Sequence, residues 1–207
     1  GNGSDFGNLS AGKRGAGGCN STTRGIVGGG ASSPGGAPGA VNVIDYITMA
    51  SAGNASDFGD LSGTRYNFTA TSSSVRGVFS NGNVGPGGPL TNIIEYITIA
   101  TTGNTTDFGD STVSLYGRAA CASPTRGLFG GGDDDSNKSN VIDYITIAST
   151  GDATDFGDLT VARRNFGSAS SRVRGTWGGG YTPSASNVID YVTIASTGDA
   201  ADFGDLL

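Results

Sequence analysis

Short runs of β-branched and aromatic residues recur along the chain, separated by stretches rich in Gly, Ser, Thr and Asn. The clearest run, residues 187–194, contains no Gly or Pro, which predicts a strand. In its first counterpart, Ile44 and Tyr46 lie on one face and Val43 and Ile47 lie on the other. Both faces are largely apolar, so the strand is expected to be covered on both sides. A stack of small sheets packed face to face supplies that cover.

The pattern repeats four times along the chain, as three recurring sequence motifs show. The triplet Asp-Phe-Gly recurs at intervals of 52, 50, 48 and 47 residues, beginning at Asp5, Asp57, Asp107, Asp155 and Asp202. The dipeptide Arg-Gly begins at Arg24, Arg76, Arg126 and Arg174. An acid precedes tyrosine at Asp45, Glu95, Asp143 and Asp190. All variation in length falls between the Arg and the Tyr, so each repeat is expected to have a constant framework and one exposed variable loop.

Each repeat predicts four short strands, called a to d in chain order. In the last repeat they lie near residues 164–170, 173–177, 187–194 and 202–206. Four strands in a unit of about 50 residues are typical of a β-propeller blade. We therefore predict an all-β fold, a β-propeller of four-stranded antiparallel blades, with a β-solenoid as the alternative.

The chain divides into one propeller domain with four full repeats. Their approximate ranges are residues 11–61, 62–111, 112–159 and 160–207. Residues 1–10 correspond to an extra outer strand of a preceding blade. This phase favours a ring with further blades, which a longer protein or a second copy of the chain would supply, although four blades are enough to close a ring.

Three features of the repeat carry a resemblance. Glycines follow strand b at residues 28–30, 130–132 and 178–180, although the second repeat has Ser80-Asn81-Gly82 instead. Strand c carries Tyr46, Tyr96, Tyr144 and Tyr191. A later aromatic follows at Phe58, Phe108, Phe156 and Phe203. The unit resembles a kelch repeat, which usually has Trp at this last position. The sequence of the repeat is also similar to that of uncharacterised kelch-like proteins of large marine tailed bacteriophages. The resemblance implies a virion or tail component.

The amino-acid composition excludes several kinds of catalytic mechanism and binding partner. The chain has no His among its 207 residues, which excludes mechanisms that need imidazole as base, nucleophile or metal ligand. The net charge of −6, with no basic cluster, argues against a nucleic-acid partner. No apolar run reaches 18 residues, so no membrane insertion is expected. Cys19 and Cys121 fall on non-adjacent blades, which predicts free thiols.

The recurring charged residues suggest a structural role. We expect the repeated Arg and the repeated acid to pair in each blade, since a lone buried charge is unfavourable. An Arg ring lining the channel for an anionic ligand is the alternative. The four later Phe residues are expected to pack between blades. Acids spaced by three residues, such as Asp152, Asp155 and Asp158, are a pattern that calcium could use, but Asx residues in turns more often cap backbone amides. We therefore expect no metal ion and no cofactor.

The variable b–c loops are expected at residues 31–41, 83–91, 133–139 and 181–186. Because strands alternate in direction, these loops emerge on the same rim as the d–a connections. Tyr181 is the leading contact residue, since exposed aromatic rings commonly anchor sugars or proteins. The acidic run of the third loop, Asp133, Asp134 and Asp135, is interpreted as solvated charge, with a weak cation or ligand contact as the alternative. Asn83 is a further candidate contact residue.

These observations favour a non-enzymatic structural or binding protein. We expect a phage tail or fibre component, in a virion or another extracellular setting, that contacts a host-surface glycan or a neighbouring virion protein through the variable loops; self-association is a further expectation. A carbohydrate-active propeller enzyme and a pure structural spacer are the alternatives. An enzyme of that kind needs two positioned carboxylates, whereas the acids here mostly repeat with the framework.

Overall fold

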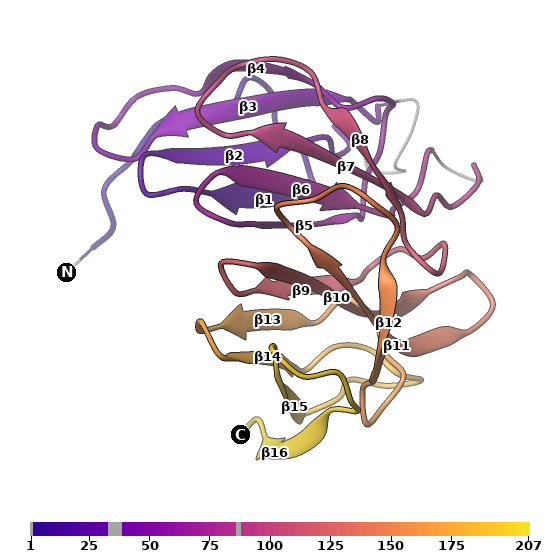
Figure 1. Ribbon diagram of the computed structural model, residues 1–207. Coiled ribbons are helices and arrows are strands. Elements are labelled where there is room, and N and C mark those ends of the chain that lie inside the picture. The colour runs from indigo at the N-terminus through magenta and orange to yellow at the C-terminus, as the bar shows by residue number, and fades with distance from the viewer. Residues whose placement is uncertain (1, 33–38, 86–87) are drawn as a thin grey trace.

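The computed structural model describes residues 2–32, 39–85 and 88–207 and shows four small antiparallel sheets (Figure 1). The first contains β1 (Gly17–Asn20), β2 (Arg24–Gly28), β3 (Val43–Thr48) and β4 (Ser56–Asp60). The second contains β5 (Thr69–Ser72), β6 (Arg76–Ser80), β7 (Ile93–Thr98) and β8 (Thr106–Asp110). The third contains β9 (Ala119–Ala122), β10 (Arg126–Asp133), β11 (Lys138–Thr146) and β12 (Thr154–Asp158). The fourth contains β13 (Gly167–Ser170), β14 (Arg174–Gly178), β15 (Val188–Thr193) and β16 (Ala201–Asp205).

The strands of each sheet follow one another in chain order, which confirms the predicted four-stranded blades and the all-β propeller fold. The inner strands contact each other in the order β1, β5, β9 and β13. In Figure 1 the N-terminus lies at the left and the C-terminus lies at the bottom, beside β16. In the described part of the chain every strand pairing lies within one blade, so side chains and turns join the blades to each other. No helix long and apolar enough to cross a membrane occurs among the described residues.

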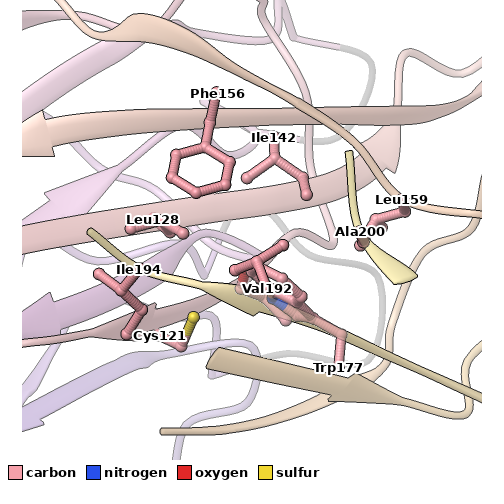
Figure 2. Packing of buried hydrophobic residues seen from close by; sticks show 10 residues of the cluster. Cys121, Leu128, Ile142, Phe156, Leu159, Trp177, Val192, Ile194 and Ala200 are labelled. Atoms are coloured by element: carbon pink, nitrogen blue, oxygen red, sulfur yellow. Dashed lines mark hydrogen bonds between the residues drawn. The ribbon is translucent and has the colours of Figure 1, made fainter. Parts of the chain in front are cut away.

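In the second and third blades strand c lies between two apolar layers, as its sequence predicts. In the third and fourth blades, Leu128, Ile142 and Phe156 meet Trp177 and Ile194 of the following blade (Figure 2). Equivalent clusters lie between the first and second blades and between the second and third. Burying such side chains removes apolar surface from water, so each blade is stabilised by its neighbours more than by its own small sheet.

Left-handed backbone explains the glycines after strand b. Gly29 and Gly30 have φ of +57° and +98°, a region that most side chains avoid. The second repeat keeps this conformation with Asn81 at φ +65° and Gly82 at φ +105°. Asn tolerates the left-handed region better than most residues. The departure of this repeat from the triple glycine therefore leaves the turn unchanged.

Strands β4, β8 and β12, the strands d of the first three blades, also bind the turn between strands c and d of the next blade. The Gly103 amide donates to the Phe58 carbonyl at 2.7 Å, and the Thr105 amide donates to the Asp60 carbonyl at 2.9 Å. In return the Asp60 amide donates to Oδ1 of Asn104 at 3.0 Å. The same arrangement recurs at the other blade junctions, where Asp152 and Asp199 take the place of Asn104.

The N-terminal segment occupies this position on the first blade. The Gly53 amide donates to the Phe6 carbonyl at 2.7 Å, and the Ala55 amide donates to the Asn8 carbonyl at 2.8 Å. Residues 2–10, the described part of the expected extra outer strand, are not paired as a β-strand. Gly7 nevertheless has φ of +140°, close to the +143° of Gly59 in β4. A strand d is otherwise paired with the strand c of its own blade, and among the described residues no such strand lies beside this segment.

Candidate functional site

The recurring acids are paired with cations that the sequence analysis did not assign to them. Asp143 lies 2.6 Å from Arg118, and Asp190 lies 2.8 Å from Arg163. Likewise, Asp45 pairs with Lys13 and Glu95 pairs with Arg65. All eight side chains are at most 2% exposed. Each acid thus binds a cation from the connection that leads into its own blade.

The expected pairing of these acids with Arg24, Arg76, Arg126 and Arg174 is therefore wrong. In the first blade, Arg24 faces Thr48 across the strand pair, whereas Asp45 faces Val27. The two charged residues stand three positions apart along the ladder, and an odd number of positions puts their side chains on opposite faces of the sheet.

The Arg of each Arg-Gly pair instead connects neighbouring blades. The guanidinium of Arg24 lies 4.6 Å from the ring centroid of Tyr46 and donates to the Ile99 carbonyl of the next blade at 2.9 Å. Arg76 and Arg126 repeat both contacts. The Tyr in turn meets the later Phe edge to face, as with Tyr46 and Phe58 at 6.0 Å. Phe58, Phe108 and Phe156 are buried between blades, and Phe203 is exposed.

The b–c loops and the d–a connections do meet on one rim, here called the b–c rim. In each blade an isolated antiparallel bridge joins the two, at Arg14–Ala31, Tyr66–Asn83, Tyr116–Asp133 and Arg164–Tyr181. Asn83, Asp133 and Tyr181 therefore occupy the same structural position in successive blades. Residues 33–38 and 86–87 of the first two variable loops lie outside the described residues.

Tyr181 is the exposed member of this set, with 43% of its surface accessible. Its ring lies 5.3 Å from Nζ of Lys138 and 5.5 Å from the guanidinium of Arg164. Arg164 also lies 5.3 Å from the ring of Tyr116 and donates a hydrogen bond to its hydroxyl. We call Tyr181, Lys138, Arg164, Tyr116 and Asp133 the Tyr181 cluster.

Asp133 is the buried anion of the Tyr181 cluster rather than part of a solvated run. One of its carboxylate oxygens lies 3.3 Å from Arg164 and 3.8 Å from Lys138. Burial raises the pKa of Tyr116; the charge of Arg164 opposes this shift, and Asp133 and Asp135 add to it. The two cations share Asp133 and keep about a quarter of their side-chain surface exposed, so the cluster offers a ligand an aromatic ring and a partly exposed pair of cations, one of whose charges Asp133 neutralises.

The other acidic candidates build the loop itself. Oδ1 of Asp134 accepts hydrogen bonds from the amides of Ser136 at 2.9 Å and Asn137 at 2.6 Å, which lower its pKa. Asp135 has a left-handed backbone, with φ of +73°. Asn83 is buried in the framework of the second blade. Among the described residues, no group of three or more His, Cys, Asp or Glu side chains is placed to hold a metal ion.

Sequence reasoning missed Lys138, Arg164 and Tyr116. Arg164 and Tyr116 occupy the same position in their repeats, the residue of the d–a connection that bridges to the b–c loop. That repeated position was the available signal, because it lies opposite Asp133 in one blade and Tyr181 in the next. The contact between the two blades becomes visible only in three dimensions.

A hollow lies at the end of the blades opposite the b–c rim. The four a–b turns, residues 20–22, 72–74, 122–124 and 170–172, line a cavity of about 740 Å³. Its lining consists mostly of Ser, Thr and Asn, with Arg172 as its charged residue. Several of these hydroxyls already accept hydrogen bonds from their own turns, as Ser171 does from the amides of Val173 and Arg174. The hollow therefore offers fewer free groups than its composition suggests.

The four stacked sheets define a protein of the β-propeller class. No protein-family model matches the chain, and no curated protein matches it. Its function is therefore inferred from its own residues.

Proposed function

We propose that this protein is a non-enzymatic binding protein of kelch-like propeller type, a component of a phage tail or fibre that uses its b–c rim to bind an acidic glycan on the host surface. The observation that carries the proposal is the Tyr181 cluster. An exposed aromatic ring flanked by two cations suits a sugar ring that bears a carboxylate.

The location of the cluster supports recognition. It lies where the repeats differ most in length and chemistry, on a framework whose blades are otherwise alike. Divergent loops on a rigid scaffold are the usual arrangement of a binding surface. The kelch-like and phage parts of the proposal rest on the resemblance of the repeat and on its length of about 50 residues.

The carboxylates favour binding over catalysis. Asp45, Glu95, Asp143 and Asp190 are each buried in an ion pair. A glycosidase needs one carboxyl group that can donate a proton and a second that can attack or activate water, both facing the substrate. Carboxylates that are held by buried cations inside the blades do not meet that requirement.

Calorimetric titration with two polysaccharides tests the proposal. Oligosaccharides of alginate carry a carboxylate on every sugar, and dextran is neutral. We expect the protein to bind the first and not the second. Tyr181→Ala is expected to weaken binding about tenfold, because the ring supplies the stacking surface. Lys138→Met is expected to weaken it less and to reduce its dependence on salt.

Val84→Ala is the matched control, since Val84 is an exposed apolar residue of another b–c loop. Its affinity for alginate should equal that of the unchanged protein. Equal affinity after Tyr181→Ala, or equal binding of dextran, would overturn the acidic-glycan proposal. If neither polymer binds but loop substitutions release the protein from the particle, the b–c rim binds a neighbouring virion protein. Particle attachment that survives all loop substitutions favours the spacer interpretation.

A further inference from the structure

The outer face of the fourth blade repeats a surface that is covered in every other blade. Phe58, Phe108 and Phe156 are each 2% exposed because the next blade packs on them. Phe203 occupies the same position and is 56% exposed. Leu206 beside it is also exposed, although its counterparts Leu61 and Leu159 are buried. Within residues 2–32, 39–85 and 88–207, no segment covers this face of the fourth blade.

The backbone of β16 is likewise left uncovered by any described turn. In the preceding blade, a Cβ added to Gly157 would lie 2.5 Å from the carbonyl carbon of Gly198, because the next turn is packed against that strand. A Cβ added to Gly204 would meet nothing within 4 Å. Among the described residues, no turn donates to the carbonyls of Phe203 and Asp205.

Arg174 shows what the missing neighbour would supply. Its guanidinium lies 4.5 Å from the Tyr191 ring, as in the other blades. Arg24, Arg76 and Arg126 also donate to a backbone carbonyl of the following blade. In the described part of the chain Arg174 has no such acceptor. A hollow of about 320 Å³ lies there, lined in part by Arg174, Thr176 and Phe203.

The first blade presents the complementary surface. Met49 is 48% exposed, whereas its counterparts Ile99, Ile147 and Ile194 are each 1% exposed beneath the preceding blade. The turn at Gly53–Ala55 is the same turn that binds strand d elsewhere, and here it holds the N-terminal segment through the Phe6 and Asn8 carbonyls. A single segment therefore occupies a surface that elsewhere receives an entire blade.

We propose that these two faces bind each other between two copies of the chain. Strand β16 of one copy docks on the 53–55 turn of the second copy and displaces its N-terminal segment. Phe203 and Leu206 then cover Met49, and Arg174 donates to the Met49 carbonyl. A whole blade buries more apolar surface than one segment, which favours the exchange. The displaced segment remains tethered and competes, so association depends on protein concentration.

This interface joins different faces of the two copies, so it closes into a ring or propagates as a chain of copies. It lies away from the b–c rim and does not depend on the ligand bound there. The three blade junctions inside the chain are its template.

Sedimentation velocity over a broad concentration series tests the proposal on the full chain. We expect association of the unchanged protein to rise with concentration, and Phe203→Asp and Met49→Asp each to abolish it. Both residues are exposed in the single copy, so both variants are expected to fold, which circular dichroism verifies. An equimolar mixture of the two variants retains one intact face of each kind and is expected to form a 1:1 complex.

Val173→Asp is the control for the added charge. Val173 is 63% exposed, and its counterpart Val75 stays 59% exposed although its blade is covered, so this position lies outside the interface. Association should be unchanged in this variant.

Substitutions at two glycines distinguish the N-terminal segment from strand β16, the two segments that compete for the 53–55 turn. Gly7 and Gly204 have similar φ values, +140° and +130°, so an Ala strains both backbones alike. A Cβ on Gly7 overlaps the Gly53 carbonyl and releases the N-terminal segment, so Gly7→Ala should strengthen association. A Cβ on Gly204 has space in the single copy but would meet that carbonyl of the second copy, so Gly204→Ala should abolish association.

The outcomes are decisive in both directions. If the Gly7→Ala variant associates and the unchanged protein does not, the proposal is still supported. That result would show that the N-terminal segment competes with β16 of a second copy for the 53–55 turn. The proposal is overturned if the unchanged protein and Gly7→Ala both stay monomeric throughout the series. It is also overturned if either Asp variant still self-associates, or if their mixture forms no complex.

Discussion

Arg118 lies with its Nη1 atom 2.6 Å from Oδ2 of Asp143, and both side chains are fully buried. In the other blades the partner of the acid stands seven residues after the Phe of the Asp-Phe-Gly triplet, at Lys13, Arg65 and Arg163. In the third repeat that position is Leu115, and Arg118 stands three residues later. The fold thus keeps the buried ion pair although the sequence has moved the cation.

Removing this cation should destabilise the protein strongly. Arg118→Met leaves Asp143 buried without its counter-ion, and breaking such a pair typically costs about 3–5 kcal/mol. The free energy of unfolding in urea measures the loss. The double variant Leu115→Arg, Arg118→Phe gives the third repeat the residues that the second and fourth have at these positions, and it should recover much of the stability. A double variant no more stable than Arg118→Met would show that the two positions are not equivalent.

The Gly of the Arg-Gly pair should resist substitution wherever a preceding blade packs on it. A Cβ added to Gly77 would lie 2.6 Å from Sγ of Cys19, a side chain of the preceding blade. Overpacking of this kind costs about 1–3 kcal/mol, so Gly77→Ala should lower the urea midpoint. Gly25→Ala is the matched control, because its nearest neighbours are side-chain atoms of Ile47 in the same blade, at 3.0 Å and 3.2 Å.

A double-mutant cycle identifies the source of that effect. Combining Gly77→Ala with Cys19→Ala removes the overlapping sulfur, so the two changes together should destabilise less than the sum of the single changes. Strict additivity would contradict the packing explanation.

The two thiols should make stability fall at alkaline pH. Burial raises the pKa of Cys19 and of Cys121 from 9.0 to about 12. Between these values the folded protein holds thiol protons that the unfolded chain has released, so stability is lost as pH rises from 9.0 toward about 12. Urea midpoints measured across this range should drop more steeply for the unchanged protein than for a variant with both residues changed to Ala. Equal slopes would contradict the burial of the thiols.

The same burial predicts slow chemical modification. Both cysteines are unpaired, as the spacing of the repeats had indicated, and the structure shows that both are buried. A maleimide should label them only when urea unfolds the chain, because the thiolate is the reactive form and the reagent cannot reach the sulfur. Rapid labelling of the folded protein would contradict this placement.

Much of the fold follows from the sequence, because it rests on local periodicity. The β-branched run around Tyr191 predicted strand c, and the constant spacing from Phe156 to Arg174 predicted a framework of fixed length. The sequence predicted the candidate site less completely than the fold. Tyr181 was found from its loop position, but Asp133 proved to be buried and its partners Lys138 and Arg164 were missed.

The linear sequence by itself determined the number of blades, the order of their strands and the loops that vary, since each depends on residues close together along the chain. The tertiary structure alone decided which cation neutralises Asp143, that Arg24 reaches Ile99, and that Phe203 is left uncovered. These contacts join residues of different strands and blades. Their partners are chosen by the side of the sheet to which each side chain points and by whether another blade stands next to it.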